Sequence, residues 1–236
     1  MNPLQYTFNP IGTIHSCYRE KFGIPRQSGL VKSATTTLEL LPPYNISDAL
    51  RRIGEFSHLW IIFIFHRSEH NSNKITARPP RLGGNERVGV FASRSPFRPN
   101  PIGLSVVELL EVDGIRLKLA GGDFLDGTPV LDIKPYIPYA DSIPNANGAY
   151  ATQPPEAHNQ VRFSPKAAQL IQTLENDSRP ALRQLICDML AFNPRPAYQT
   201  DDPDRIFGTR LFDLEIQWRQ SNSNILVVEI KQATRS

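Results

Sequence analysis

The chain of 236 residues carries 26 lysines and arginines against 23 aspartates and glutamates, with a net charge of +3 and a pI of about 8.9. This near balance excludes a polyanionic or polycationic protein, and most of the cations are arginines, which suit planar partners such as carboxylate and phosphate. Cys17 and Cys187 lie far apart and outside any Cys-x-x-Cys pair, so we expect a cytoplasmic protein without a disulfide or metal site. No apolar run is long enough to span a bilayer, so we expect no membrane partner.

The N-terminal part of the chain is rich in strand patterns. Apolar and β-branched residues cover 5–14 and 35–40, and both segments are predicted strands. The run 59–65 is apolar at every position, which predicts a central strand buried on both faces. Between them, Ser47 can cap a short amphipathic helix over 48–53.

The strand series continues beyond this point. Residues 87–91 form a short candidate strand, and 102–112 and 115–120 flank the dipeptide Asp-Gly, which is a strong hairpin signal. A last strand is expected over 129–137. About six strands with one short helix predict a closed barrel and argue against an alternating β-α-β nucleotide-binding fold.

The composition then changes to proline, asparagine, alanine and glycine, which is typical of a linker. Ser164 followed by Pro165 predicts a helix start, a second apolar stripe over 179–191 predicts another helix, and 211–219 with 225–230 alternates as a terminal hairpin. The sequence therefore predicts a mainly β fold with an α+β appendage. Its parts are a closed single-sheet β-barrel over 1–142, a linker over 143–163 and a small C-terminal α+β domain over 164–236.

Two charged loops are the strongest functional signals. Three prolines within 96–101 stiffen a segment that displays Arg94 and Arg98, so little entropy is lost when it binds a partner. The second loop carries Asp123 and Asp126, although an Asp-Gly sequence can also serve only to shape a turn. The alternative for these arginines is that they form surface ion pairs or are solvated and bind no partner.

Two further patterns carry less weight. Residues 66–70 match the H-x-x-E-H pattern of metalloproteases, but they follow a strand where that site needs a helix, so we predict no metal site. Arg78, Arg81 and Arg87 form a basic loop rich in glycine and proline, which either tracks phosphates or is simply solvated.

Taken in order, these motifs resemble a known family, the tRNA adenosine N6-methyltransferases that act on threonylcarbamoyl-adenosine next to the anticodon. The similarity extends over nearly the whole chain, although Asn193 stands where bacterial members usually carry aspartate. The segments that carry it are 25–27, 56–60, 65–66, 78–84, 89–92, 98–103, 126–136 and 193–198.

The resemblance implies a small β-barrel enzyme that binds S-adenosylmethionine, forms a homodimer whose subunits meet near the cofactor, and methylates this modified base in threonine tRNAs. A guanidinium can bind the methionyl carboxylate in bidentate fashion, and backbone groups can read the adenine or ribose. Carried over by position, the implied cofactor residues are Pro25, Arg26, Gln27, His66, Arg67, Arg94, Leu104, Leu125, Asp126, Gly127 and Thr128.

The chemistry and the RNA contacts are also open to prediction. In-line positioning of N6 against the methyl group should supply much of the acceleration. Because N6 attacks poorly until its proton leaves, a base would help, and Asp126, Asp141 and Tyr139 are the candidates. The alternative is a non-catalytic β-barrel module that binds RNA or an adenosyl ligand. Expected RNA contacts are Arg78, Arg81, Arg98 and Arg195 on the backbone, with Phe97 or Tyr198 stacking on a base.

Overall fold

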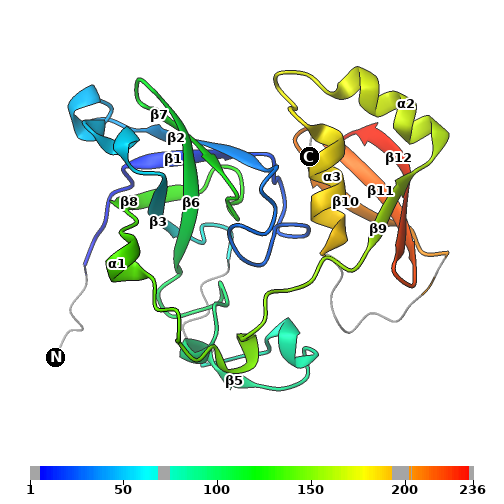
Figure 1. Ribbon diagram of the computed structural model, residues 1–236, viewed down its shortest axis with the longest axis horizontal. Helices are drawn as coiled ribbons and strands as arrows, with labels where there is room; N and C mark the ends of the chain where they lie inside the picture. The colour runs from blue at the N-terminus through cyan, green and yellow to red at the C-terminus, as the bar shows by residue number, and fades with distance from the viewer. Residues whose placement is uncertain (1–5, 69–74, 193–201, 203, 234–236) are drawn as a thin grey trace.

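Figure 1 shows the computed structural model, which describes residues 6–68, 75–192, 202 and 204–233. Its larger unit is a closed barrel with the strand order β1-β2-β7-β6-β3-β8. These strands are β1 (Gly12–Ser16), β2 (Thr35–Leu40), β3 (His58–Ile64), β6 (Ile102–Asp113), β7 (Arg116–Ala120) and β8 (Pro129–Pro135). The predicted closed β-barrel is confirmed, although its first strand begins at Gly12 and not at residue 5.

Alternate residues of these strands fill the barrel, because successive side chains of a strand point to opposite faces. Leu38 on β2 faces Leu117 on β7, and both are fully buried. On β3, Leu59, Ile61 and Phe63 point inward and are buried, whereas the alternate residues of the strand are only partly covered. The prediction that this apolar strand is buried on both faces is therefore wrong for its outer face.

Strand directions divide the barrel into two ends. All neighbouring strands are antiparallel, so the β1–β2, β3–β6 and β7–β8 connections leave from one end, which we call the loop end. These connections cover residues 17–34, 65–101 and 121–128. The opposite end, which we call the turn end, holds the β2–β3 connection, the β6–β7 turn and the segment that follows β8.

The turn end is built from short elements. The β6–β7 connection uses the predicted Asp-Gly turn, in which Gly114 adopts a φ of 56°. The predicted helix over 48–53 is instead two 3₁₀ turns, η1 (Ser47–Leu50) and η2 (Ile53–Glu55), because Arg52 between them has a left-handed φ of 68° that a helix does not tolerate. The four-residue helix α1 (Pro138–Asp141) follows β8.

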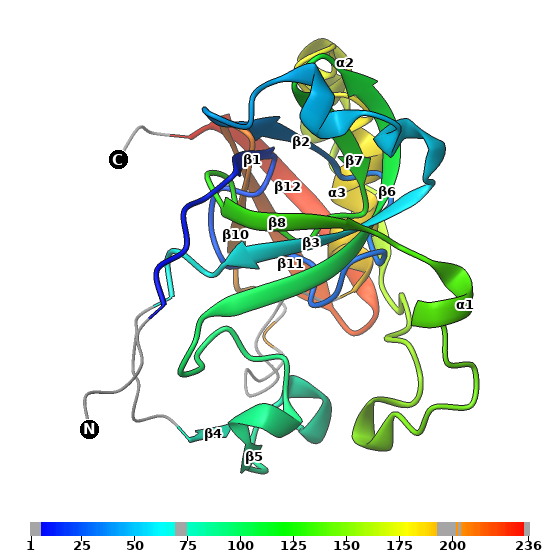
Figure 2. The same cartoon turned by 90° about the vertical axis from the view of Figure 1, so that its left-hand side faces the viewer.

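The β3–β6 connection extends away from the barrel, as Figure 2 shows. It contains a two-residue ladder between β4 (Thr76–Ala77) and β5 (Val88–Gly89) and the 3₁₀ turns η3 (Pro80–Leu82) and η4 (Val90–Ala92). The strand predicted over 87–91 is therefore a short pair outside the barrel. The segment after α1, with the turn η5 (Ala149–Ala151), packs on this excursion, where the Tyr150 hydroxyl donates to the Ala92 carbonyl at 2.7 Å.

The C-terminal unit is a four-stranded sheet with two helices, as the predicted α+β appendage requires. Its strand order is β10-β11-β12-β9, with β9 parallel to β12. Strand β9 falls within the predicted linker and the predicted hairpin omitted β10, because strands of four or five residues leave little periodicity to detect. The elements are β9 (Gln160–Phe163), α2 (Pro165–Leu174), α3 (Leu182–Ala191), β10 (Phe207–Leu211), β11 (Leu214–Ser221) and β12 (Asn224–Gln232).

The two units share a core. The β1–β2 connection buries Cys17, Tyr18 and Val31 in the same apolar cluster as the C-terminal sheet and helices. Hydrogen bonds join them as well: the Phe212 amide donates to the Cys17 carbonyl at 2.7 Å. The C-terminal unit therefore fixes the position of a connection that belongs to the barrel.

Candidate functional site

The loop end gathers most of the predicted cofactor residues. Pro25, Arg26 and Gln27 lie in the β1–β2 connection, His66 and Arg67 follow β3, and residues 125–128 precede β8. These segments lie far apart in sequence, and only the antiparallel order of the barrel brings them to one end. Direct contacts join these segments in pairs.

Arg94 and Gln27 connect the excursion to the β1–β2 connection. The Arg94 guanidinium donates a hydrogen bond from Nη1 to the Gln27 Oε1 atom. Gly29 adds a backbone link, because its amide donates to the Gly121 carbonyl at 2.8 Å. These two hydrogen bonds fix the β1–β2 connection to the excursion on one side and to the β7–β8 loop on the other.

His66 lies against the β7–β8 loop. Its Nδ1 atom is 3.4 Å from the Thr128 Oγ1 atom, and Thr128 itself donates to the Leu125 carbonyl at 2.6 Å. Partial burial, with the nearby Arg67 charge, lowers the pKa of His66. The imidazole is therefore neutral at pH 7, where one ring nitrogen accepts and the other donates a hydrogen bond.

Asp126 is engaged by the fold on both carboxylate oxygens. Its Oδ1 atom accepts a hydrogen bond of 2.9 Å from the Ser16 amide, and Oδ2 forms an ion pair with Arg19. The next residue, Gly127, has a φ of 76°, and a Cβ there would lie 3.9 Å from the His66 Nε2 atom. This loop is shaped to bring backbone close to the imidazole.

The other two predicted bases lie at the turn end. Asp141 caps α1, where its Oδ2 atom accepts from the Ile137 amide at 2.8 Å and from Trp60 Nε1 at 3.0 Å. Tyr139 on the same short helix is 91 % exposed. The seven residues of β8 separate α1 from Asp126, a span of roughly 20 Å. Within one chain, the structure brings only Asp126 to the loop end.

The predicted RNA residues are only partly displayed. Arg78 is exposed, whereas Arg81 donates to the Gln153 carbonyl and Arg98 donates to the Ser93 carbonyl at 3.2 Å. Arg98 therefore stabilises the fold of its own loop. Phe97 is 36 % exposed, with the Lys21 ammonium 5.7 Å from its ring centroid. Arg195 and Tyr198 lie outside the described residues.

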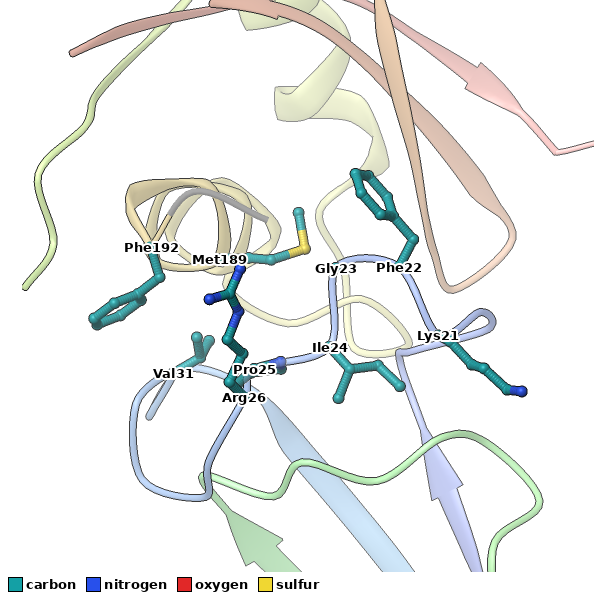
Figure 3. Close-up of a pocket in the computed structure, with 9 residues that line it drawn as sticks. All are labelled: Lys21, Phe22, Gly23, Ile24, Pro25, Arg26, Val31, Met189 and Phe192. Carbon is teal, nitrogen blue, oxygen red and sulfur yellow. The ribbon is translucent and has the colours of Figure 1, made fainter. Parts of the chain in front are cut away.

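A cavity of about 160 Å³ opens where the β1–β2 connection meets α3 (Figure 3). Arg26 extends from its loop toward Met189 on that helix, and burial, with the Arg81 charge, lowers the pKa of its guanidinium. The volume is below that of pockets for drug-sized ligands, roughly 300 Å³ or more. Arg26 thus contributes to the junction between the two units.

Comparison with known proteins assigns the chain to a family. Residues 13–142 match the tRNA-methyltransferase O N-terminal domain, and residues 156–233 match the TrmO C-terminal domain. The chain belongs to the tRNA-methyltransferase O family. The resemblance in the sequence and the barrel with its appendage are both confirmed by this result.

Relatives of the tRNA-methyltransferase O family match along the full chain. The tRNA (adenine(37)-N6)-methyltransferase of Escherichia coli is 47 % identical over 96 % of this chain and 98 % of its own length. A Pseudomonas aeruginosa relative, named a putative S-adenosylmethionine-dependent methyltransferase, is 44 % identical over 95 % and 97 %. A crystal structure of TrmO from P. aeruginosa superposes with a TM-score of 0.83 at 39 % identity, covering 98 % of both chains.

Sequence reasoning missed two side chains, Arg19 at the loop end and Phe91 on the β3–β6 excursion. Arg19 has no recognisable motif, and its partner Asp126 is 107 positions away. Phe91 is 80 % exposed on η4, next to the buried Val90 that anchors the turn. A strand pattern over 87–91 concealed Phe91, since alternation alone does not distinguish a displayed ring from a packed one.

Two absences concern only the part of the chain that the structure describes. No three histidine, cysteine or acidic side chains there lie close enough to hold a metal ion. No helix in the described ranges has the length and apolarity needed to cross a membrane.

Proposed function

We propose that the protein transfers a methyl group from S-adenosylmethionine to N6 of threonylcarbamoyl-adenosine beside the anticodon of tRNA. The observation that carries the proposal is the meeting of three connections with the predicted cofactor residues at one end of the barrel, in a chain that matches a tRNA (adenine(37)-N6)-methyltransferase over 96 % of its length. Threonine tRNAs are the proposed substrates, and the cytoplasm is the proposed compartment.

The residues present suit the cofactor. Arg94 supplies a guanidinium for the methionyl carboxylate, and neutral His66 with the backbone at Gly127 supplies donors and acceptors for the adenosyl part. The bound cofactor supplies an electrophilic methyl sulfonium. Leu104, the remaining predicted cofactor residue outside the connections, is 55 % exposed on the outer face of β6 and offers apolar surface there.

The acceptor nitrogen, N6, is a poor nucleophile in this substrate. Its lone pair is delocalised into the purine and the carbamoyl group, so it attacks poorly until its proton leaves. Asp126 already accepts from the Ser16 amide on one carboxylate oxygen and pairs with Arg19 on the other, so both oxygens are engaged by the fold. We therefore propose that rigid in-line positioning provides most of the acceleration, with Asp126 holding the loop that orients the two reactants.

Binding of tRNA is proposed at the excursion between β3 and β6. Arg78 and Arg87 are exposed there and can contact phosphates, while the displayed ring of Phe91 provides a surface for a splayed base. Such contacts release counterions, so affinity for tRNA should fall as salt rises.

A homodimer is proposed on the outer face of β3 and β6. Ile62 pairs with Leu104 and Ile64 with Ile102, and this apolar strip borders the loop end. A second copy covering the strip would bring its own basic surface near the same site. Ile102→Glu should yield monomers in sedimentation velocity, whereas Leu226→Glu, equally exposed at 42 % but on β12, should not.

The activity is tested by incubating the protein with labelled S-adenosylmethionine and total tRNA, followed by nucleoside analysis. Label in N6-methylated threonylcarbamoyl-adenosine supports the proposal. Binding of cofactor or RNA without transfer of label would instead identify a non-catalytic module, the alternative reading of the sequence. tRNA that lacks the threonylcarbamoyl group is the matched substrate control.

A further inference from the structure

Arg94 and Asp123 are opposite charges that lie near each other at the loop end without forming an ion pair. Arg94 donates to Gln27, and Asp123 accepts a hydrogen bond of 2.6 Å from the Ser105 hydroxyl. Backbone geometry brings their segments together: Gly29, two residues after Gln27, donates its amide to the carbonyl of Gly121, two residues before Asp123, at 2.8 Å. Each charge is therefore held by a neutral partner.

The environment of Asp123 disfavours its charge. Burial raises the pKa of this carboxyl, against the weaker opposing effects of Ser105 and Arg94. The other titratable group facing it is Tyr18, whose buried hydroxyl has no hydrogen-bond partner. A buried carboxyl whose pKa is raised, beside a charged loop, is a candidate for a role in binding.

Asp126, three residues further on, provides a contrast within the same loop. It is paired with Arg19 and receives a backbone amide, so its charge serves the fold. Among the described residues, no cation forms an ion pair with Asp123. Two carboxylates with such different surroundings are expected to have different roles.

We propose that Arg94 and Asp123 together recognise the α-amino acid end of S-adenosylmethionine, with Arg94 binding the carboxylate and Asp123 the ammonium. This inference rests on the proposed function. A zwitterion satisfies both charges at once, whereas a ligand with one charge leaves the other partner desolvated and unmatched. Ser105 and Gln27 hold the two side chains in place and do not neutralise them.

The test compares two adenosyl ligands that differ at this end. S-adenosylhomocysteine carries the amino acid group, and 5′-methylthioadenosine lacks it. In calorimetric titrations, Asp123→Asn should weaken S-adenosylhomocysteine about 10- to 100-fold, the range for a lost charge-assisted contact, and leave 5′-methylthioadenosine unchanged. Arg94→Gln should show the same selectivity. Asp132→Asn, which alters a carboxylate paired with Lys134 on β8, should affect neither ligand.

The outcomes separate this inference from the proposed function. If the native protein binds both ligands and Asp123→Asn weakens both equally or neither, the inference is overturned while the cofactor site stands. If the native protein binds neither ligand, both fall. Thermal melting checks folding, and Asp123→Asn should melt at the same or a higher temperature because a disfavoured charge is removed.

The inference also predicts a pH effect. The carboxyl must be ionised to hold an ammonium, so affinity for S-adenosylhomocysteine should fall as pH drops through the raised pKa of Asp123. This acid limb should disappear in Asp123→Asn. A limb of equal size in titrations with 5′-methylthioadenosine would contradict the assignment.

Discussion

The two ends of the barrel are made from the same six strands but differ in how those strands are connected. The turn end uses a tight Asp-Gly turn, two 3₁₀ turns and a four-residue helix. The loop end uses three connections that carry the proposed cofactor and RNA residues. The difference shows that the barrel determines where the connections meet, and the connections determine the chemistry.

An aromatic cluster supports the loop end from within the barrel. The Phe63 ring packs edge-on against Phe65 and Phe124, with centroids 5.1 and 5.0 Å apart. Gly103 lies on the neighbouring strand, where a Cβ would overlap the Phe63 ring. The loop end is therefore the less tolerant of substitution.

The largest effect is expected at Gly103. Gly103→Ala should lower the free energy of unfolding by about 3 kcal/mol, because the Phe63 ring must move and disturb both of its aromatic partners. Urea denaturation measures this change. Gly89→Ala is the control, since a Cβ there meets nothing within 4 Å, and it should change stability by about 0.5 kcal/mol or less. Equal effects would show that the cluster is looser than its geometry implies.

Substituting one aspartate at each end of the barrel distinguishes a role in positioning the reactants from a purely structural role. Asp126→Asn removes the ion pair with Arg19 and should lower kcat/KM roughly tenfold or more, in line with a lost charge-assisted contact. Asp141→Asn alters only contacts at the turn end, with the Ile137 amide and Trp60 Nε1, and should leave kcat/KM within about twofold. Methyl transfer under saturating tRNA provides the measurement. The reverse order would return Asp141 to the list of catalytic candidates.

His66 should make the loop end sensitive to acid. Its folded pKa lies below the unfolded value of about 6.5, so the unfolded chain binds the proton first. Its contribution to stability is present above that pH and is lost as pH falls through the folded pKa. His66→Gln should reduce the loss of stability between pH 7.5 and about 5.5, as followed by chemical denaturation. Arg67→Gln should act in the same direction to a smaller extent, because it removes only the second cause of the shift.

The smallest effect should be a gain at the turn end. Arg52 has a left-handed φ of 68° that glycine adopts without strain, and its ion pair with Glu55 is exposed. Arg52→Gly should therefore raise stability by up to about 1 kcal/mol and leave methyl transfer unchanged. Arg51→Ala removes a similarly exposed pair with Asp48 and should be neutral. A loss of activity in Arg52→Gly would show that the two ends are coupled.

The sequence predicted the features that depend on local patterns. Alternation located most barrel strands, and the Asp-Gly dipeptide located the β6–β7 turn. The resemblance supplied the family and the cofactor. The sequence could not predict contacts between distant segments. No spacing rule pairs Arg19 with Asp126, and none places Asp141 at the turn end.

The shared core has a consequence for cooperativity. Tyr18 and Val31 belong to the N-terminal domain by sequence but are buried among residues of α3 and β11. The loop that carries Gln27 lies between them, so it cannot keep its shape when the C-terminal sheet melts. Amide hydrogens of Tyr18 and Leu185 should exchange with deuterium at one common opening rate, as members of a single foldon.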